Sequence, residues 1–475
     1  MWRILRRSAR SVRRLQYHVC SYCSSTNPRK ENLYDVTIVG GGMVGASLAC
    51  ALGFEGALSK HRVLVVEAGH DRPFELPEKY SNRVSSITPG SRKLLESVGA
   101  WDHISNMRVK HYKRLNVWDA CGDGHIVFDS SPDLNSDSDM ACIVENNVIV
   151  AALNKQMKLL EPTVTVKYGA RIKKINFPDP AWAMESETRG NPWMEVELED
   201  GSVIHSRLLV GADGAASTVR KATDIEYLSW SYEQWGVVGT LRLGEITENV
   251  VAWQKFLPTG PLALLPLSET HSSVVWTTTR EHAQELVSLP EDRFVDAINN
   301  AFWEDMDRHP AVDTASKLAQ SISSFIEPFA GSSSAVQMPP SISGVEEGSR
   351  GMFPLGLGHA THYVQPRLAL IGDAAHRVHP LAGQGVNLGF GDVACLRDVL
   401  VAAAKDGCDL GSLDHLLQYE TERQRSVVPM MAAVDFLKRL FSTSHALPVA
   451  ARTLGLLTTN ALTPVKEQII SFAMK

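Results

Sequence analysis

Hydrophobic residues in this chain gather in short runs that end at glycine or at an acidic residue. The runs "YDVTIVGGG" (34–42) and "HRVLVVEAG" (61–69) predict buried strands, and "MVGASLACALG" (43–53) between them predicts a helix of small residues. Two similar runs lie far along the chain, "RLLVGADG" (207–214) and "RLALIGDAAH" (367–376). Because these strand ends are separated by long insertions, we expect one α/β domain that is assembled from distant segments.

The hydrophobic pattern changes between residues 225 and 280. Here "WGVVGTLRL" (235–243), "NVVAWQKFLPTGPLALLPL" (249–267) and "HSSVVWTTTR" (271–280) are apolar runs interrupted by Gly and Pro, which predicts a second sheet. Residues 301–345 are polar and rich in Ser and Pro, and we expect a loop-laden insertion. Residues 421–475 predict amphipathic C-terminal helices, whose apolar faces either pack on the core or contact a membrane or partner.

Composition is that of an ordinary globular protein. The chain has 475 residues, of which 44% are hydrophobic, 21% charged and 7% aromatic. No run approaches the roughly 18 consecutive apolar residues of a spanning helix. An integral membrane protein is therefore not expected, although peripheral attachment stays open.

The first 30 residues differ from the rest, since they hold eight Lys and Arg and no acidic residue. Arginines at three- and four-residue spacing predict a basic amphipathic helix suited to mitochondrial import. The alternative is a disordered basic arm for nucleic acid or anionic lipid. Removal of this segment would change the formal net charge from −6 to −14. A mature chain that acidic is not expected to bind nucleic acid.

The first glycine cluster predicts a dinucleotide site. Gly40, Gly42 and Gly45 form G-x-G-x-x-G between a strand and a helix, where the turn is tight and backbone amides can approach a pyrophosphate. Glu67 ends the next strand, 22 residues beyond Gly45, where a carboxylate accepts hydrogen bonds from an adenosine ribose. A carboxylate there would repel a 2′-phosphate, so these residues indicate NAD or FAD.

Metal binding and disulfides are not expected. The seven cysteines are scattered, and the C-x-x-C of Cys20 and Cys23 has no second pair. His376 and His379 have no third ligand at suitable spacing, and Pro380 makes a continuing helix unfavourable.

The downstream motifs decide between the two dinucleotides. "GADG" (211–214), "IGDAAH" (371–376) and "HPLAGQGVN" (379–387), together with the first glycine motif, resemble the class A flavoprotein aromatic hydroxylases with the para-hydroxybenzoate hydroxylase fold. Within that family, "SNRVSSITPGS", "WQKFLPTGPLALLPL", "FPLGLGHA" and "YETERQR" are similar to the flavin monooxygenases of mitochondrial ubiquinone biosynthesis. The similarity extends over essentially everything after residue 31.

The resemblance implies that FAD lies on both glycine clusters. Asp373 would accept hydrogen bonds from the ribityl and phosphate region, while amides near Gly383 and Gly385 would face the flavin beside Pro380. Arg83 resembles an arginine that reaches towards the flavin, and Asn146 stands where relatives usually have Arg or Gln. The predicted cofactor-binding residues are Gly40, Gly42, Gly45, Glu67, Arg83, Asn146, Asp213, Gly214, Asp373, Gly383, Gly385, Val386 and Asn387.

The implied activity is aromatic monooxygenation. A flavin C4a-hydroperoxide would transfer oxygen to C5 of 3-polyprenyl-4-hydroxybenzoate, with a later polyprenylphenol as a possible second substrate. The implied partners are O2, a ferredoxin with its NADPH-dependent reductase, and the coenzyme Q biosynthetic complex. The implied location is the matrix face of the mitochondrial inner membrane, with peripheral attachment. For a ferredoxin, "MRVKHYKR" (107–114) and "RIKK" (171–174) are candidate basic surfaces, unless they are simply solvated faces.

These assignments divide the chain into a discontinuous FAD-binding Rossmann-like domain, an inserted α+β substrate domain and C-terminal helices. The expected segments are a presequence (1–30), FAD-binding segments (31–105, 141–224 and 366–420), substrate-domain segments (106–140 and 225–365, with the insertion 301–345) and C-terminal helices (421–475). Two other functions remain possible from the residues. One is a flavin dehydrogenase or oxidase on the same fold, and the other is a non-enzymatic prenyl-binding protein of the GDP-dissociation-inhibitor type.

Overall fold

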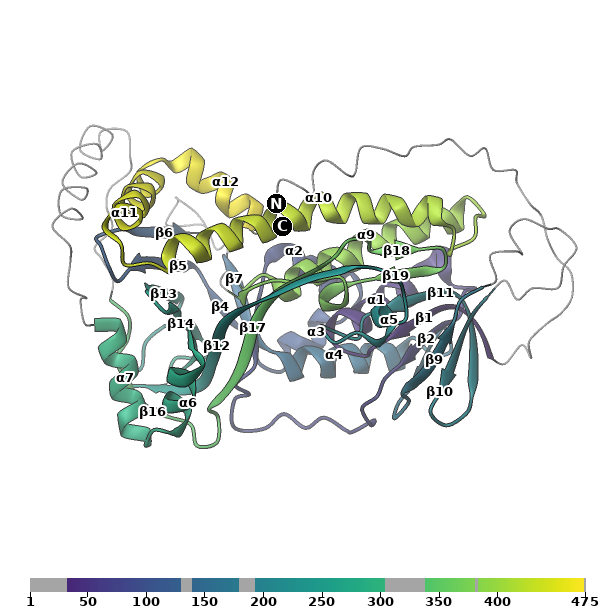
Figure 1. Ribbon diagram of the computed structural model, residues 1–475. Coiled ribbons are helices and arrows are strands. Elements are labelled where there is room, and N and C mark those ends of the chain that lie inside the picture. Colours follow the sequence, from purple (N-terminus) through teal and green to yellow (C-terminus); the bar gives the residue numbers. More distant parts are fainter. Residues whose placement is uncertain (1–31, 130–138, 179–192, 304–337, 381–382, 474–475) are drawn as a thin grey trace, which may run out of the picture.

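A computed structural model describes residues 32–129, 139–178, 193–303, 338–380 and 383–473. Within them two large sheets lie side by side, and the long helix α10 (Leu413–Phe441) runs over both (Figure 1). The presequence 1–30 and most of the insertion 301–345 fall outside the described residues. The two ends of that insertion are regular, because α7 (Glu291–Trp303) and β16 (Ile342–Val345) extend into it.

The first sheet is mostly parallel, as expected for a dinucleotide-binding domain. Its path runs β18-β19-β11-β1-β2-β8, and β10 and β9 form an antiparallel extension from β11. The strands are β1 (Leu33–Val39), β2 (Val63–Val66), β8 (Val164–Lys167), β9 (Ile172–Asn176), β10 (Met194–Leu198), β11 (Val203–Gly211), β18 (Val364–Gln365) and β19 (Leu368–Leu370). The four predicted strands are therefore confirmed as β1, β2, β11 and β19. Since β1, β11 and β19 are parallel neighbours, the loops that follow them open at one edge of the sheet.

Helices cover the first sheet and close its core. α1 (Met43–Phe54) packs between α4 (Asn146–Leu159) and α9 (Gly385–Lys405). α2 (Pro89–Ser97), α3 (Trp101–Ser105), α5 (Thr218–Lys221) and the short turns η2 (Gly56–Leu58) and η5 (Gly372–Ala374) complete this half. A small sheet, β3 (Val84–Ile87), β7 (Ala141–Glu145) and β4 (Lys110–Tyr112), adjoins it.

The second sheet has nine strands in the order β20-β17-β12-β15-β14-β13-β5-β6, with β16 on β12. They are β5 (Arg114–Asp119), β6 (His125–Asp129), β12 (Tyr227–Leu243), β13 (Val251–Leu257), β14 (Gly260–Pro266), β15 (His271–Thr279), β16, β17 (Gly351–Ala360) and β20 (His376–Arg377). This confirms the strands predicted between 225 and 280. β12 and β17 are long enough to run from one half into the other (Figure 1).

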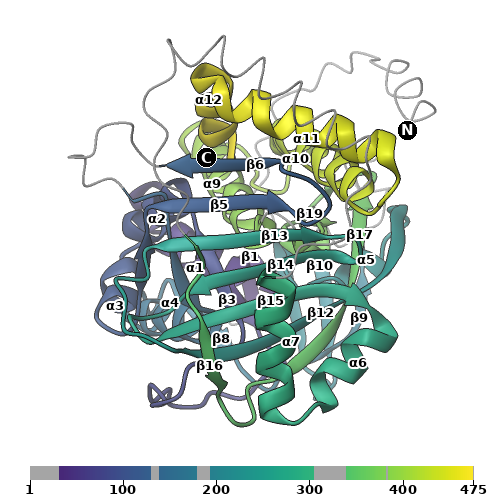
Figure 2. The same cartoon turned by 90° about the vertical axis from the view of Figure 1, so that its left-hand side faces the viewer.

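The two faces of this second sheet pack against different helices. α6 (Arg280–Ser288) and α7 cover its outer face (Figure 2). There Trp253 and Trp276 join a buried cluster with Phe294. Phe256, next but two along β13 from Trp253, points the other way and stacks on Phe441 of α10, with ring centroids 4.0 Å apart. The alternation along the strand therefore separates these aromatic side chains.

The C-terminal helices continue from α10 as α11 (Ala446–Ala461) and α12 (Thr463–Ala473). α11 lies on the edge strand β6, where the Asn460 side chain accepts a hydrogen bond of 3.1 Å from the Val127 amide. Edge strands need such partners, because their outer amides are otherwise unpaired. No helix in the described part of the chain is long and apolar enough to cross a membrane.

Candidate functional site

The first glycine loop lies between β1 and α1, and each of its three motif glycines has a distinct steric reason. Gly40 has φ +103°, and a Cβ on it would lie 2.5 Å from the carbonyl oxygen of Ala212. A Cβ on Gly45 would lie 2.0 Å from the Gly40 carbonyl oxygen. Gly42 is different, because a Cβ there would meet nothing within 4 Å. Gly40 and Gly45 therefore shape the turn, while Gly42 leaves open space beside the first amides of α1. Binding of a pyrophosphate there stays a prediction.

Glu67 at the end of β2 belongs to the same loop. Its carboxylate accepts a 2.6 Å hydrogen bond from the Gly41 amide and another of 2.6 Å from the Gly69 amide. These bonds fix the carboxylate at the edge of the loop, and each oxygen keeps further acceptor capacity. A ribose hydroxyl can use that capacity.

The second glycine loop is the stretch from the end of β19 to the start of α9. It meets the first loop at one side chain, Val44 of α1. A Cβ on Gly372 would lie 3.3 Å from Val44, and a Cβ on Gly389 of α9 would lie 2.6 Å from it. α1 and α9 can approach this closely because Gly389 has no side chain. The N-terminal part of α9 and the end of β19 thus lie against the first glycine loop, although more than 300 residues separate them in sequence.

Asp373 directly follows Gly372 in the short turn η5. Its side chain is exposed to solvent, yet the surrounding protein desolvates the carboxylate and raises its pKa. Among the described residues no hydrogen bond to this carboxylate is formed. An acceptor that is accessible and unpaired suits the hydroxyl groups of a bound ligand.

The residues before and at the start of α9 are held in place from both sides. Gly383 has φ +61° and donates a 2.9 Å hydrogen bond to the Pro380 carbonyl. The Asn387 side chain accepts from Ser91 Oγ at 2.8 Å and donates to the Ser86 carbonyl at 2.8 Å, so it ties α9 to β3 and α2. Because that side chain is already used, Asn387 and Val386 can offer a ligand their backbone amides at the helix N-terminus, where Gly385 is the first helical residue.

A buried ion network supports the same loop from behind. Asp392 of α9 accepts from the Gly372 amide at 2.8 Å, and its carboxylate lies 2.7 Å from both His376 Nε2 and Arg423 Nε. Burial by itself would raise the pKa of Asp392, but the charges and hydrogen bonds of His376 and Arg423 outweigh it and lower that pKa. Sequence reasoning missed Asp392 and Arg423, because nothing in their local pattern shows that α9 and α10 meet.

The third motif, "GADG", is anchored mainly by its own helix. The Asp213 carboxylate accepts hydrogen bonds from the Thr218 amide at 2.6 Å and from the Ser217 hydroxyl, so it caps α5. Arg220 donates to the Ala374 carbonyl at 2.6 Å and therefore links this turn to the turn of Asp373. Gly214 has φ +77° and open space where its Cβ would be. A direct contact of Asp213 or Gly214 with a cofactor stays a prediction.

Arg83 and Asn146 lie together beside the second glycine loop. The Asn146 amide donates to the Arg83 carbonyl at 3.0 Å, and the Asn146 side chain accepts from Ser85 Oγ at 2.7 Å. The Arg83 guanidinium lies over the Phe353 ring of β17, 5.5 Å from its centroid. A Cβ on Gly383 would be 3.8 Å from Ser86 on the same strand, which places this pair near the loop. Their contact with the flavin stays a prediction.

The two histidines before the loop have structural surroundings. His376 bonds to Asp392, and His379 is buried with its ring edge-on to Tyr232, 5.2 Å between centroids. Burial and the nearby Lys438 lower the pKa of His379 to about 4, so it is neutral at pH 7. Across the described residues no group of three His, Cys, Asp or Glu side chains is arranged to hold a metal ion.

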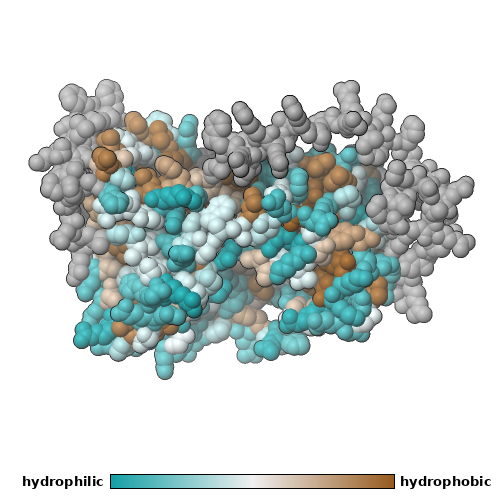
Figure 3. All heavy atoms as spheres, in the orientation of Figure 1, coloured by the Kyte–Doolittle hydropathy of each residue, from teal (hydrophilic) through white to brown (hydrophobic). Residues whose placement is uncertain are grey.

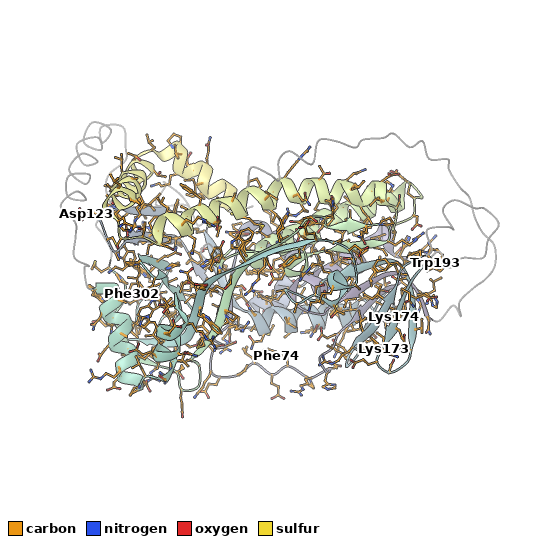
Figure 4. All side chains as sticks on the ribbon, in the orientation of Figure 1. Phe74, Asp123, Lys173, Lys174, Trp193 and Phe302 are labelled. Carbon is orange, nitrogen blue, oxygen red and sulfur yellow. The ribbon has the colours of Figure 1, made fainter. Side chains whose placement is uncertain are left out.

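The two candidate basic surfaces are partly neutralised by ion pairs. Arg108 pairs with Glu145, Lys110 with Glu269 and Arg114 with Asp129, at 2.9, 2.6 and 2.6 Å. In the second candidate, Lys173 pairs with Glu197 at 2.7 Å. Lys173 and Lys174 lie on β9, at the end of the molecule remote from Phe302 in the other half (Figure 4). The first surface therefore offers an acidic partner little uncompensated charge.

Comparison with known proteins bears on these features. The FAD binding domain family matches residues 33–321 and 345–434. The mitochondrial ubiquinone biosynthesis monooxygenase COQ6 of Xenopus tropicalis is 55% identical over 453 residues, which cover 95% of this chain and 95% of that protein. The human protein of the same name is 53% identical over 446 residues, covering 94% and 93%. The chain belongs to the family of mitochondrial ubiquinone biosynthesis monooxygenases. It is a mitochondrial, FAD-dependent monooxygenase of ubiquinone biosynthesis, and the resemblance found in its motifs is confirmed.

Solved structures agree with the fold. p-Nitrophenol 4-monooxygenase PnpA from Pseudomonas putida superposes with a TM-score of 0.65 at 17% identity, covering 93% of this chain and 97% of PnpA. PqsL from Pseudomonas aeruginosa, described as a probable FAD-dependent monooxygenase, gives 0.62 at 23% identity, covering 90% and 100%. At such identities the agreement concerns the fold alone. It confirms the predicted α/β class with its C-terminal helical region.

Proposed function

We propose that this monooxygenase hydroxylates C5 of 3-polyprenyl-4-hydroxybenzoate, with a later polyprenylphenol as a possible further substrate. The observation that supports the proposal is the close approach of the two glycine loops at Val44, which would let one extended dinucleotide contact both loops. The relatives named for ubiquinone biosynthesis support the substrate class, since such a substrate is a prenylated phenol. The ring position and the exact substrate are the proposed part.

FAD, when bound, supplies the redox chemistry and the activation of O2. The chain supplies position and charge. Gly42 and the first amides of α1 would hold the pyrophosphate, and Asp373 would hold the ribityl hydroxyls. The first amides of α9 would face the pyrimidine side of the flavin, where donors stabilise negative charge; one such donor can contribute roughly 3 kcal/mol. The hydrogen bond that Asn387 donates to the Ser86 carbonyl, and the one that the buried Asp392 accepts from the Gly372 amide, keep these groups in place before FAD binds.

For electron supply we propose a ferredoxin with its NADPH-dependent reductase, and for assembly the coenzyme Q biosynthetic complex. The location we propose is the matrix face of the inner membrane, with peripheral attachment and a cleaved presequence that ends near residue 30. The ion pairs around Arg108 and Lys110 predict that electrostatic steering of an acidic donor is weak here.

The test uses purified protein with bound FAD and a short-chain 3-prenyl-4-hydroxybenzoate. NADPH alone and reduced ferredoxin are each mixed with it under anaerobic conditions, and flavin bleaching is followed. Oxygen is then admitted, and the product's ring substitution is determined by NMR. Bleaching by ferredoxin and a new hydroxyl at C5 support the proposal. Rapid bleaching by NADPH alone contradicts ferredoxin as the electron donor, and a hydroxyl at another ring position contradicts hydroxylation at C5. Substrate oxidation without oxygen insertion would indicate a dehydrogenase or oxidase.

A further inference from the structure

Helix α11 has an outer face without charge. Arg452 is the one charged residue among its sixteen, and it points inward, where its side chain is buried against Asp119 at 2.6 Å. Leu447, Ala451 and Gly455 recur every four residues and are all exposed, Leu447 to 84%. A helix on a protein surface ordinarily turns its polar residues outward. α11 does the reverse.

The neighbouring helices extend this feature. Exposed large hydrophobic side chains continue on the end of α10 and along α12, and both helices pack against α11. Figure 3 shows hydrophobic surface over α11 and α12. We call the following six residues the C-terminal apolar surface: Phe436, Leu437, Leu447, Leu462, Val465 and Ile469. Contiguous exposed apolar surface of this kind marks contact with a membrane or another protein.

The charges beside the C-terminal apolar surface favour a membrane over a protein partner. The chain as a whole has a net charge of −6, yet beside this surface three cations, Lys438, Arg439 and Lys466, stand against two acids, Asp435 and Glu467. Arg439 pairs with Asp435 at 2.8 Å, and the Lys438 ammonium lies 4.8 Å from the centroid of the Tyr232 ring. The surface is therefore slightly basic on an acidic chain, with Lys438 and Arg439 after Phe436 and Leu437, and Lys466 after Val465. Apolar side chains flanked by cations suit the interface of an anionic bilayer, where the apolar groups enter the acyl boundary and the cations meet lipid phosphates.

We propose that the C-terminal apolar surface binds the surface of a bilayer that contains anionic phospholipid. One apolar cluster connects this region with the flavin site, since it contains Val378 and Leu388 beside the second glycine loop and also Phe441 of α10, with Leu456 of α11 packed against it. The inference rests on the proposed function for its use, because a polyprenyl substrate resides in lipid. Docking through α11 would bring the enzyme to that substrate.

The test compares three full-length proteins in vesicle flotation: wild type, Leu447→Gln with Ile469→Gln, and the matched control Ile246→Gln. Ile246 is 80% exposed but lies in a loop of the substrate domain, outside the surface. Vesicles of phosphatidylcholine alone report on apolar contact, because the basic residues 1–30 find no anionic headgroup there. Vesicles with added phosphatidylglycerol report on the additional contribution of electrostatic attraction to anionic lipid.

We expect wild type and Ile246→Gln to bind both vesicles, more tightly with phosphatidylglycerol, and the double variant to bind at least tenfold more weakly to phosphatidylcholine. Absence of wild-type binding, or equal binding by the double variant, would overturn the proposal. A wild-type dimer that the double variant converts to monomer without a change in flotation would assign the surface to a second copy instead. FAD content and hydroxylation of a soluble short-chain substrate are measured in parallel, and we expect both to be unchanged in the double variant. If the wild-type protein does not hydroxylate the short-chain substrate, the proposed function is contradicted. If it hydroxylates that substrate but does not float with vesicles, only the docking surface is contradicted.

Discussion

The backbone amide of Gly41 donates a 2.6 Å hydrogen bond to the carboxylate of Glu67, so the first glycine loop is fixed to the end of the neighbouring strand. β1 and β2 pair in parallel up to Val39 and Val66, which brings the two loops that follow them together. A residue usually assigned to ribose binding therefore also shapes the phosphate loop. Loss of the Glu67 carboxylate should therefore weaken FAD binding both at the ribose and at the phosphate loop.

Replacement of this carboxylate by an amide tests that consequence. Glu67→Gln removes the negative charge and leaves one oxygen to accept from two amides, so we expect FAD to bind at least tenfold more weakly, since charge-assisted hydrogen bonds contribute about 1.5–3 kcal/mol. Flavin fluorescence titration of the apoprotein measures it. The control is Glu199→Gln, an exposed acid after β10. Equal affinity in Glu67→Gln and wild type would show that Glu67 does not contribute.

Gly42→Trp places a large side chain in the space that Gly42 leaves open. A side chain there meets no protein atom within 4 Å of its Cβ, so we expect the variant to fold but to lack bound flavin. Gly56 also has open space around a Cβ and lies beyond α1, so Gly56→Trp is the matched control and should keep its flavin. Absorbance of the purified proteins near 450 nm measures occupancy, and circular dichroism checks the fold. Full flavin occupancy in Gly42→Trp would show that the pyrophosphate does not bind beside Gly42.

Asp373→Asn should have opposite effects on binding and on stability. Because desolvation raises the pKa of Asp373 in the folded protein, its contribution to stability is present below about pH 4, where the carboxyl is protonated in both states, and is lost as the pH rises through the folded-state pKa. The apoprotein of Asp373→Asn should therefore be more stable to urea than wild-type apoprotein at pH 7, with a difference that disappears below about pH 4. Its affinity for FAD should fall. A variant that is less stable at pH 7 and binds FAD normally would contradict both expectations.

The ion pair of Arg452 and Asp119 holds α11 on the second sheet. Both side chains are almost fully buried, and Arg452 also donates to the carbonyls of Leu440 and Thr443. Arg452→Met leaves a buried carboxylate without its cation, so we expect a loss of about 3–5 kcal/mol in the free energy of unfolding. Arg92→Met breaks an exposed i,i+4 pair with Glu96 and should cost less than about 1 kcal/mol. Urea denaturation compares the two, and similar losses would disprove the structural role of Arg452.

The strands and the first glycine loop could be predicted because their signals are local. Apolar runs that end at Gly40 or Glu67 specify both the strand and the chemistry at its end. The meeting of Gly389 with Val44, and of Asp392 with Arg423, could not be predicted, because it depends on how α9 packs against α1 and α10. Asp213 has a further role that its motif did not indicate. Its carboxylate caps α5, since an acidic side chain at a strand end can serve the next helix as well as a cofactor, and its contact with FAD stays a prediction.

Transfer of oxygen from O2 to the ring tests the central claim most directly. Protein with bound FAD, reduced by ferredoxin, is supplied with a short-chain 3-prenyl-4-hydroxybenzoate under isotopically heavy O2, and the product is analysed by mass spectrometry. A monooxygenase incorporates one heavy oxygen atom for each new hydroxyl, and Gly42→Trp should form no product. Consumption of O2 with heavy label only in peroxide or water, or a hydroxyl that carries oxygen from the solvent, would contradict the account.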